Sequence, residues 1–134
     1  MLTYLNKNVN PKNRRTGDCS TRALVSCLGI SYEQALKLQL EEALKSCYDI
    51  TSHQVIEKIL NKFGYVKMKQ PRKLNGKKYM VHELDQVIRP EFRAAGVLVT
   101  VANHYVAVKD SHYIDIWDSG YKCVGNYFIK VKNV

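Results

Sequence analysis

The 134-residue chain has no apolar run long enough to cross a bilayer, because its longest run, Val97 to Val101, has only the length of a strand. The first residues, Met1 to Lys7, lack the charged start, the long apolar stretch and the small-residue cleavage site of a signal peptide. We therefore expect a cytoplasmic protein, of the cell that produces it or of its host, with no membrane partner.

Paired cysteine motifs are also missing. The four cysteines form no CxxC, and their separations match no zinc-binding pattern. In the cytoplasm they would stay reduced, and the sequence predicts neither a metal nor another cofactor. Cys27, Cys47 and Cys123 are interpreted as core residues, which leaves Cys19 as the cysteine with a chemical role.

Acidic residues are scarce beside basic ones, with 12 Asp and Glu against 21 Lys and Arg and a net charge of +9. This imbalance favours an anionic partner. Much of the positive charge lies in residues 12–15 and 67–78, and a basic surface loop is often merely solvated. Nucleic acid is a disfavoured partner, because no motif that reads nucleic acid accompanies the charge.

Turn residues and hydrophobic spacing divide the chain into helices followed by strands. A capping box, Ser31 to Gln34, predicts a helix that continues to about Lys45, and Pro90 ends the last predicted helix. The predicted helices are 19–28, 32–45, 53–63 and 81–88, and the predicted strands are 65–68, 97–101, 105–108, 113–116 and 127–131. We expect one α+β domain over residues 1–134, with N-terminal helices packed on a C-terminal antiparallel sheet.

Cys19 lies in the first turn of a predicted helix, directly after Asp18, which is interpreted as the N-cap. The partial positive charge at a helix N-terminus lowers a thiol pKa from about 8.5 toward roughly 3.5–7.5 at favourable sites. The backbone N–H of Cys19 is also free to donate to a developing oxyanion. We therefore interpret Cys19 as a nucleophile rather than as a small buried apolar residue.

A thiol nucleophile needs a base and a third group that orients the base. His104 is the candidate base, because it opens a predicted strand directly after a turn. His53 and His82 fall in the first turns of predicted helices, and His112 falls in a tight turn, so all three are interpreted as surface or capping residues.

The hairpin that follows His104 supplies the third group. With a three-residue loop between its strands, His104 faces Asp118 and Asp115 lies on the opposite face, which makes Asp118 the predicted orienting acid. A two-residue turn would instead pair His104 with Trp117, so the choice between Asp118 and Asp115 depends on the register. Trp117 is interpreted either as a shield of the His–Asp bond from water or as a large core residue.

Three segments of the sequence together resemble papain-like cysteine peptidases. They are Gly17-Asp18-Cys19 at the start of a helix, Asn103-His104-Tyr-Val-Ala-Val on a strand, and Asp115-Ile-Trp117-Asp118-Ser119 on the next. The compact type is the most similar, namely the double-glycine leader peptidases of bacteriocin exporters and small papain-like proteins of phage and prophage genomes. The resemblance spans about residues 10 to 130 and implies a papain-like fold with Cys19, His104 and Asp118 as catalytic residues.

The resemblance also implies an oxyanion donor on the loop before the nucleophile. The family has glutamine six residues before the cysteine, where this sequence has Asn13, which offers the same amide on a shorter arm.

The predicted function is that of a thiol hydrolase, a peptidase or isopeptidase, acting on a protein or peptide substrate. The same residues also support acyl transfer, so they do not separate the two reactions. The alternative is a weakly active or inactive papain-fold protein of phage origin that binds an anionic partner through its basic surface.

Overall fold

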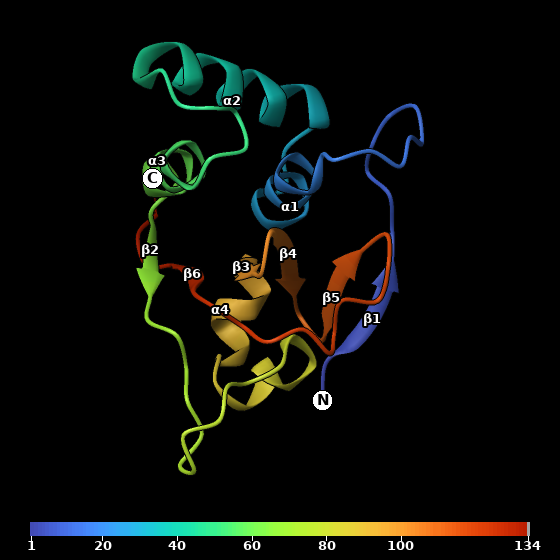
Figure 1. Ribbon diagram of the computed structural model, residues 1–134, viewed down its shortest axis with the longest axis vertical. Coiled ribbons are helices and arrows are strands. Elements are labelled where there is room, and N and C mark those ends of the chain that lie inside the picture. The colour runs from blue at the N-terminus through green and yellow to red at the C-terminus, as the bar shows by residue number, and fades with distance from the viewer. Residues whose placement is uncertain (134) are drawn as a thin grey trace.

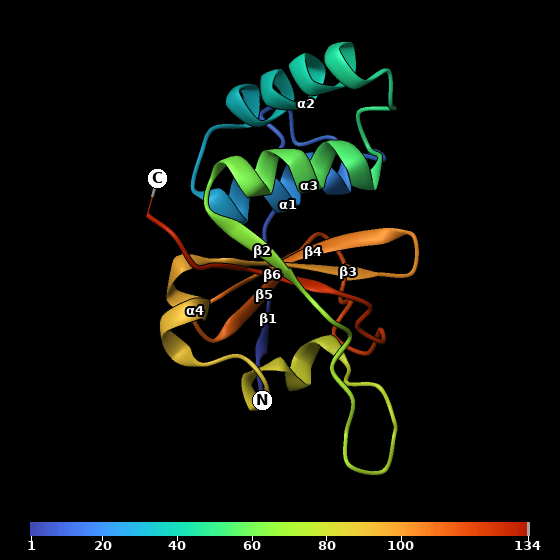
Figure 2. The same cartoon turned by 90° about the vertical axis from the view of Figure 1, so that its left-hand side faces the viewer.

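The computed structural model describes residues 1–133 and shows helices covering one face of a six-stranded sheet (Figure 1). The elements are β1 (Thr3–Asn6), α1 (Cys19–Leu28), α2 (Tyr32–Ser46), α3 (His53–Lys62), β2 (Tyr65–Met68), the 3-10 helix η1 (Val81–Gln86), α4 (Pro90–Ala95), β3 (Val97–Val101), β4 (His104–Lys109), β5 (His112–Asp115) and β6 (Tyr127–Lys130). Figure 2 shows α1 and α3 directly against the sheet and α2 above them as an outer layer. The predicted α+β class is confirmed.

Local capping signals explain where the long helices begin. The side chain of Ser31 accepts a hydrogen bond from the N–H of Gln34, and the Gln34 side chain accepts one from the N–H of Ser31, so the predicted capping box of α2 is confirmed. Ser52 caps α3 through the N–H of Val55. Asp18 is the N-cap residue of α1, as predicted, but its carboxylate makes no cap hydrogen bond. None of the helices over residues 1–133 is long and apolar enough to cross a membrane.

The sheet has the order β1-β5-β4-β3-β6-β2 and is mixed rather than antiparallel. The exception is β1, which runs parallel to β5 at one edge, with Thr3 opposite His112. In a strand of four residues with little alternation of apolar and polar side chains, the sequence indicates neither the sheet edge that the strand joins nor its direction. The sequence therefore did not predict this pairing. The remaining pairs are antiparallel.

Alternating side chains of the central strands divide the buried residues into two cores, one on each face of the sheet. Leu98, Tyr105, Ala107 and Phe128 pack against the helices α1 and α3. On the other face the valines of β3 and β4 pack against η1 and the segment that follows it. Both faces of the central strands are therefore buried, which holds the start of β4 firmly in place.

A second short helix begins at Pro90, where the sequence predicted only the end of the preceding helix. Pro90 is the first residue of α4, where its missing N–H costs nothing and its fixed φ suits the helix. The predicted helix over 81–88 is a 3-10 helix that ends at Gln86. The two short helices lie on the face of the sheet opposite α1 (Figure 2).

The C-terminal end of α1 approaches the sheet very closely at Gly96. A Cβ added to Gly96 would lie 2.1 Å from the carbonyl oxygen of Cys27, and the φ of Gly96 is 95°. Tyr65 reinforces this contact by donating from its hydroxyl to the carbonyl of Gly96, at 3.0 Å. The helix that begins at Cys19 is therefore fixed on the sheet at its far end as well.

We expect Gly96→Ala to lower the free energy of unfolding by about 3 kcal/mol or more, because a methyl group there collides with backbone and strains a positive φ. Gly76→Ala is the matched control, since Gly76 has a φ of 83° but open space around it, and we expect it to cost about 1 kcal/mol. Urea unfolding measures both. Equal losses would show that the close approach to Cys27 contributes nothing.

Candidate active site

Two residues on different elements meet at the end of the sheet. Cys19 is the first residue of α1, and His104 is the first residue of β4. Cys19, His104 and Tyr105 line the same hollow, and the His104 ring and the backbone of Tyr105 lie close enough to lower the pKa of the Cys19 thiol. Helix α1 packs along β4, so the positions of the two side chains follow directly from the packing of these elements. The predicted proximity of Cys19 and His104 is confirmed.

The electrostatics of this pair favour the charged forms. Burial raises the pKa of the Cys19 thiol, but its hydrogen bond with His104 and the nearby charge of Arg22 outweigh burial, so the net pKa is lowered. Burial lowers the pKa of His104, but the Asp115 carboxylate and Cys19 raise it to about 9. Both shifts therefore favour the form of the pair in which a thiolate lies beside an imidazolium.

The acid beside His104 is Asp115, so the prediction that Asp118 orients His104 is wrong. The ring Nε2 of His104 lies 2.6 Å from the Asp115 Oδ2 atom. The carboxylate of Asp118 instead accepts a hydrogen bond from the hydroxyl of Tyr113, at 2.6 Å.

A one-residue difference in the hairpin explains this correction. Lys109 pairs with His112 across a two-residue turn, whereas the prediction assumed a three-residue loop. Shifting the register by one residue exchanges the faces of the whole second strand, so Asp115 moves to the face of His104. The same shift brings Trp117 against the His104 ring, with the two centroids 4.8 Å apart. Trp117 is 37% exposed, so it covers His104 rather than filling the core.

The Asp115 carboxylate is buried and fully hydrogen-bonded. Besides His104, it accepts from the Ser119 hydroxyl at 2.7 Å, from the Ile116 N–H at 2.8 Å and from Nη1 of Arg22 at 3.1 Å. Burial raises the pKa of Asp115, but the hydrogen bonds from His104 and Ser119 outweigh it and hold the pKa below its usual value. Asp115 therefore stays ionised beside the imidazolium.

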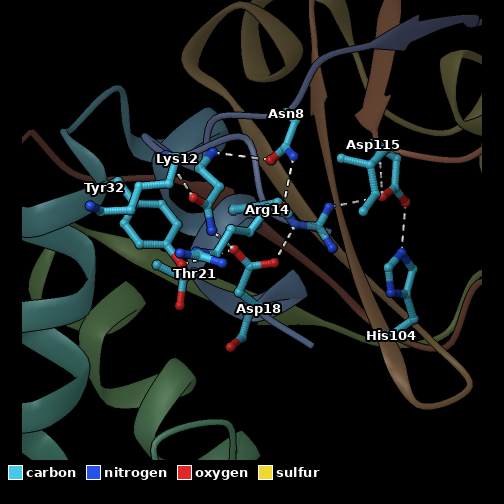
Figure 3. Close-up of polar contacts among 12 residues, drawn as sticks. Asn8, Lys12, Arg14, Asp18, Thr21, Tyr32, His104 and Asp115 are labelled. Atoms are coloured by element: carbon cyan, nitrogen blue, oxygen red, sulfur yellow. Dashed lines mark hydrogen bonds and ion pairs between the residues drawn. The ribbon is translucent and has the colours of Figure 1, made fainter. Parts of the chain in front are cut away.

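Arg22 links this carboxylate to the start of α1. Its Nε donates to Oδ1 of Asp18 at 2.8 Å, one turn back on the same helix, while its Nη1 reaches Asp115. Figure 3 shows the resulting chain of polar contacts, which runs from Tyr32 and Asp18 at one end to Asp115 and His104 at the other. The sequence analysis missed Arg22, although the spacing of Asp18 and Arg22 on a predicted helix is that of an ion pair.

The thiol faces a hollow of about 370 Å³. Its lining residues are Gly17, Cys19, Thr51, His53, Asn103, His104 and Tyr105. His53 was interpreted as a surface residue; it is exposed, but it also lines this hollow, and its Nδ1 lies 2.8 Å from the hydroxyl of Tyr105. A buried glutamine, Gln39, bonds both Ser20 of α1 and the carbonyl of Ile50, which fixes the segment that leads to His53.

Asn13, the predicted oxyanion donor, does not reach this hollow. It is exposed, has a φ of 52°, and sits in a turn closed by the hydrogen bond from its N–H to the carbonyl of Asn10. The backbone N–H of Cys19 belongs to the first turn of α1 and has no partner within the helix, so it is free to donate into the hollow.

The other cysteines differ from one another in burial. Cys27 is buried, as predicted, whereas Cys47 and Cys123 are exposed, so their interpretation as core residues is wrong. Cys47 ends α2 in a left-handed conformation at the surface, and Cys123 lies in the loop before β6. Within residues 1–133, no three His, Cys, Asp or Glu side chains come close enough to hold a metal ion.

Comparison with known proteins gives no match: no family model, no curated protein and no solved structure corresponds to this chain.

We expect Asp115→Asn to lower the pKa of His104 from about 9 by ~1 unit or more, because the substitution removes the negative charge that stabilises the imidazolium. The matched control, Asp118→Asn, should leave that pKa unchanged. A pH titration of the His104 ring signals by NMR measures both. A larger shift in Asp118→Asn than in Asp115→Asn would contradict the arrangement described.

Arg22→Gln should lower the free energy of unfolding by about 3 kcal/mol, because it leaves two buried carboxylates without their cation. The pKa values of Asp18 and Asp115 lie below that of an unfolded carboxyl. Their stabilisation is therefore present above about pH 4 and is lost as the pH falls through the folded values. Urea unfolding as a function of pH should show that the free energy of unfolding falls less on acidification in Arg22→Gln than in the wild type. Parallel curves for the two proteins would contradict this.

Proposed function

We propose that the protein is a thiol hydrolase that cleaves an amide bond, with Cys19 as nucleophile, His104 as base and Asp115 as the orienting acid. The observation that supports this best is that Cys19 and His104 line one open hollow, while the His104 ring is hydrogen-bonded to the buried Asp115 carboxylate. A thiol, an imidazole and a buried carboxylate in this order are the parts that activate a nucleophile and move a proton.

The reaction would proceed in two steps. The Cys19 thiolate attacks the carbonyl carbon, and the C–N bond breaks as the imidazolium of His104 protonates the leaving amine. This gives a thioester on Cys19 and a neutral His104. Water then attacks the thioester while His104 takes its proton, which releases the acid and restores the ion pair. Asp115 keeps the ring orientation and stabilises the imidazolium in both steps.

The negative charge on the carbonyl oxygen would be stabilised by the open ends of helices. The N–H of Cys19 belongs to the first turn of α1, and His53, the first residue of α3, lines the same hollow. In Figure 2 the first residues of α1 and α3 lie at the same end of the molecule as the turn between β3 and β4. Two helix N-termini directed at one site favour an anion there.

The finer assignments stay part of this proposal. The helices over a mixed sheet, with the cysteine on the first helix and the histidine on a central strand, are compatible with the papain-like fold that the sequence resembles. The phage origin and the cytoplasmic location expected from the sequence stay predictions. The same atoms would also support transfer of the acyl group to an amine in place of water, or cleavage of an isopeptide bond.

A second candidate is an anion-binding protein with little or no activity, and the basic loop of residues 69–78 favours it. This loop protrudes from the body of the molecule between β2 and η1 (Figure 1), and its Leu74 is fully exposed. Binding of DNA that weakens steeply with salt, with no reaction at Cys19, would favour this candidate over the hydrolase.

We expect iodoacetamide to alkylate Cys19 at mildly acidic pH, where ordinary exposed thiols are protonated and unreactive. Above about pH 9 His104 loses its proton, but Cys19 remains a thiolate, so the rate should not fall there. Cys47 and Cys123 serve as internal controls in the same chain, because they are exposed. Peptide mass spectrometry resolves the four sites, and His104→Ala should remove the reaction of Cys19 at acidic pH. Equal alkylation of Cys19, Cys47 and Cys123 at every pH would refute an activated thiol.

Turnover tests the proposal itself. We expect a peptide library prepared from a cell proteome to acquire new N-termini on incubation with the wild-type protein, and none with Cys19→Ala or His104→Ala. Asp115→Asn should cleave about 100-fold or more slowly, because it disturbs the ring that moves the proton. Asp118→Asn should cleave at the wild-type rate. A library that stays intact with the wild-type protein, together with unselective alkylation, would overturn the hydrolase.

A further inference from the structure

The hollow that contains Cys19 adjoins two others, and we call the three together the groove. A second hollow of about 450 Å³ shares His53 and Asn103 with it, and a third of about 220 Å³ shares His53 and Tyr105. The second and third also share Thr100 and Asn126. Because the hollows have lining residues in common, they lie side by side, from the thiol past His53.

The far part of this groove is built from segments that lie side by side. The loop before β6 pairs with the chain that leads into η1, through a bridge between Met80 and Cys123. The base of the basic loop joins them, since the Gln70 side chain donates to the carbonyl of Val124, at 2.8 Å. Figure 2 shows the basic loop between β2 and η1 projecting below the sheet, with its base beside the loop before β6.

The charge of the far part is positive. Lys78 and Lys122 line it, and no aspartate or glutamate does. Within the described chain neither lysine forms an ion pair, in contrast to Lys73, which is held by Glu83 at 2.7 Å. In the side hollow, Lys67 lies 3.8 Å from Glu57, so that charge is largely compensated.

Polar groups accompany the two lysines. Gln70, Asn103 and Asn126 contribute amide side chains to the same wall. Amides and ammonium groups together match carboxylates joined by peptide groups, because the ammonium pairs with the charge and the amide with the backbone.

We propose that the groove binds an acidic polypeptide, with carboxylate side chains at Lys78 and Lys122 and the bond to be cleaved at Cys19. The proposal rests on the hydrolase function and adds its substrate class. A polypeptide fits better than nucleic acid, because Tyr105 and Phe128 are buried, so that the exposed His53 ring does not form a series of rings on which successive bases could stack.

Equilibrium binding tests the substrate class without any turnover. The probes are two fluorescent peptides of equal length that differ only in glutamate or glutamine at the same positions, and the protein is the full chain with Cys19→Ala. We expect the glutamate peptide to bind about tenfold or more tightly, by fluorescence anisotropy, because two charge-assisted contacts are at stake. Equal affinity for the two peptides would overturn the proposal.

Charge removal shows where the peptide lies. The double variant Lys78→Gln, Lys122→Gln should abolish the preference for glutamate. The matched control Lys37→Gln, Lys45→Gln removes the same charge from exposed sites on α2 and should keep it. Because all four lysines are exposed, we expect both variants to fold, and thermal unfolding checks this. Loss of the preference in both variants would indicate a general effect of net charge and would overturn the placement of the peptide in the groove.

The remaining outcomes separate this proposal from the function on which it rests. A single-stranded DNA of equal charge that displaces the peptide at lower concentration than unlabelled peptide would overturn the polypeptide in favour of nucleic acid. Cleavage of the proteome library that depends on Cys19 but shows no acidic residues near the cut sites would overturn the substrate class and leave the hydrolase standing. Glutamate-selective binding that depends on the two lysines, with no cleavage, would support the groove and overturn the hydrolase.

Discussion

The carboxylate of Asp115 is the contact on which the candidate site depends, because it joins the helices to the sheet. It accepts from Arg22 of α1 and from His104 of β4, so the elements that contribute the thiol and the base meet at one buried anion. Removing these donors while the carboxylate stays buried would lower the stability of the folded protein by several kcal/mol. Satisfying it therefore fixes the distance between helix and strand, and with it the contact between Cys19 and the His104 ring.

Burial and neighbouring charges shift the pKa values of Cys19 and His104 in opposite directions, and the positions of the charged groups decide the net shift. Burial alone would raise the pKa of Cys19 and lower that of His104, leaving a neutral thiol beside a neutral ring. The ionised Asp115 reverses the outcome at His104, and the resulting cation reverses it at Cys19. Arg22 adds a second positive charge on the same helix and is itself neutralised by Asp18. The reactivity of the thiol is thus a property of the connected residues and not of its helix position alone.

The sequence predicts what local signals determine, and it misses what the tertiary packing decides. The capping box at Ser31 and the roles of Cys19 and His104 as first residues of their elements depend on a few neighbouring residues, and these predictions agree with the structure. The choice of Asp115 over Asp118 depends on the register of one hairpin. Its turn residues permit loops of two or three residues, and the pairing of β5 with both β4 and β1 selects the shorter one. The groove joins segments about 50 residues apart in the chain, such as Gln70 and Val124, so no local pattern indicates it.

The most direct test of this account is the charge state of Cys19 in the resting protein. The ultraviolet absorbance of the thiolate, taken as the difference between the wild type and Cys19→Ala and followed from acidic to neutral pH, reports that charge. The account predicts a thiolate signal at neutral pH that disappears only on acidification and is absent at neutral pH in His104→Ala. A wild-type protein whose thiolate signal appears only above about pH 8.5, as for an ordinary cysteine, would contradict it.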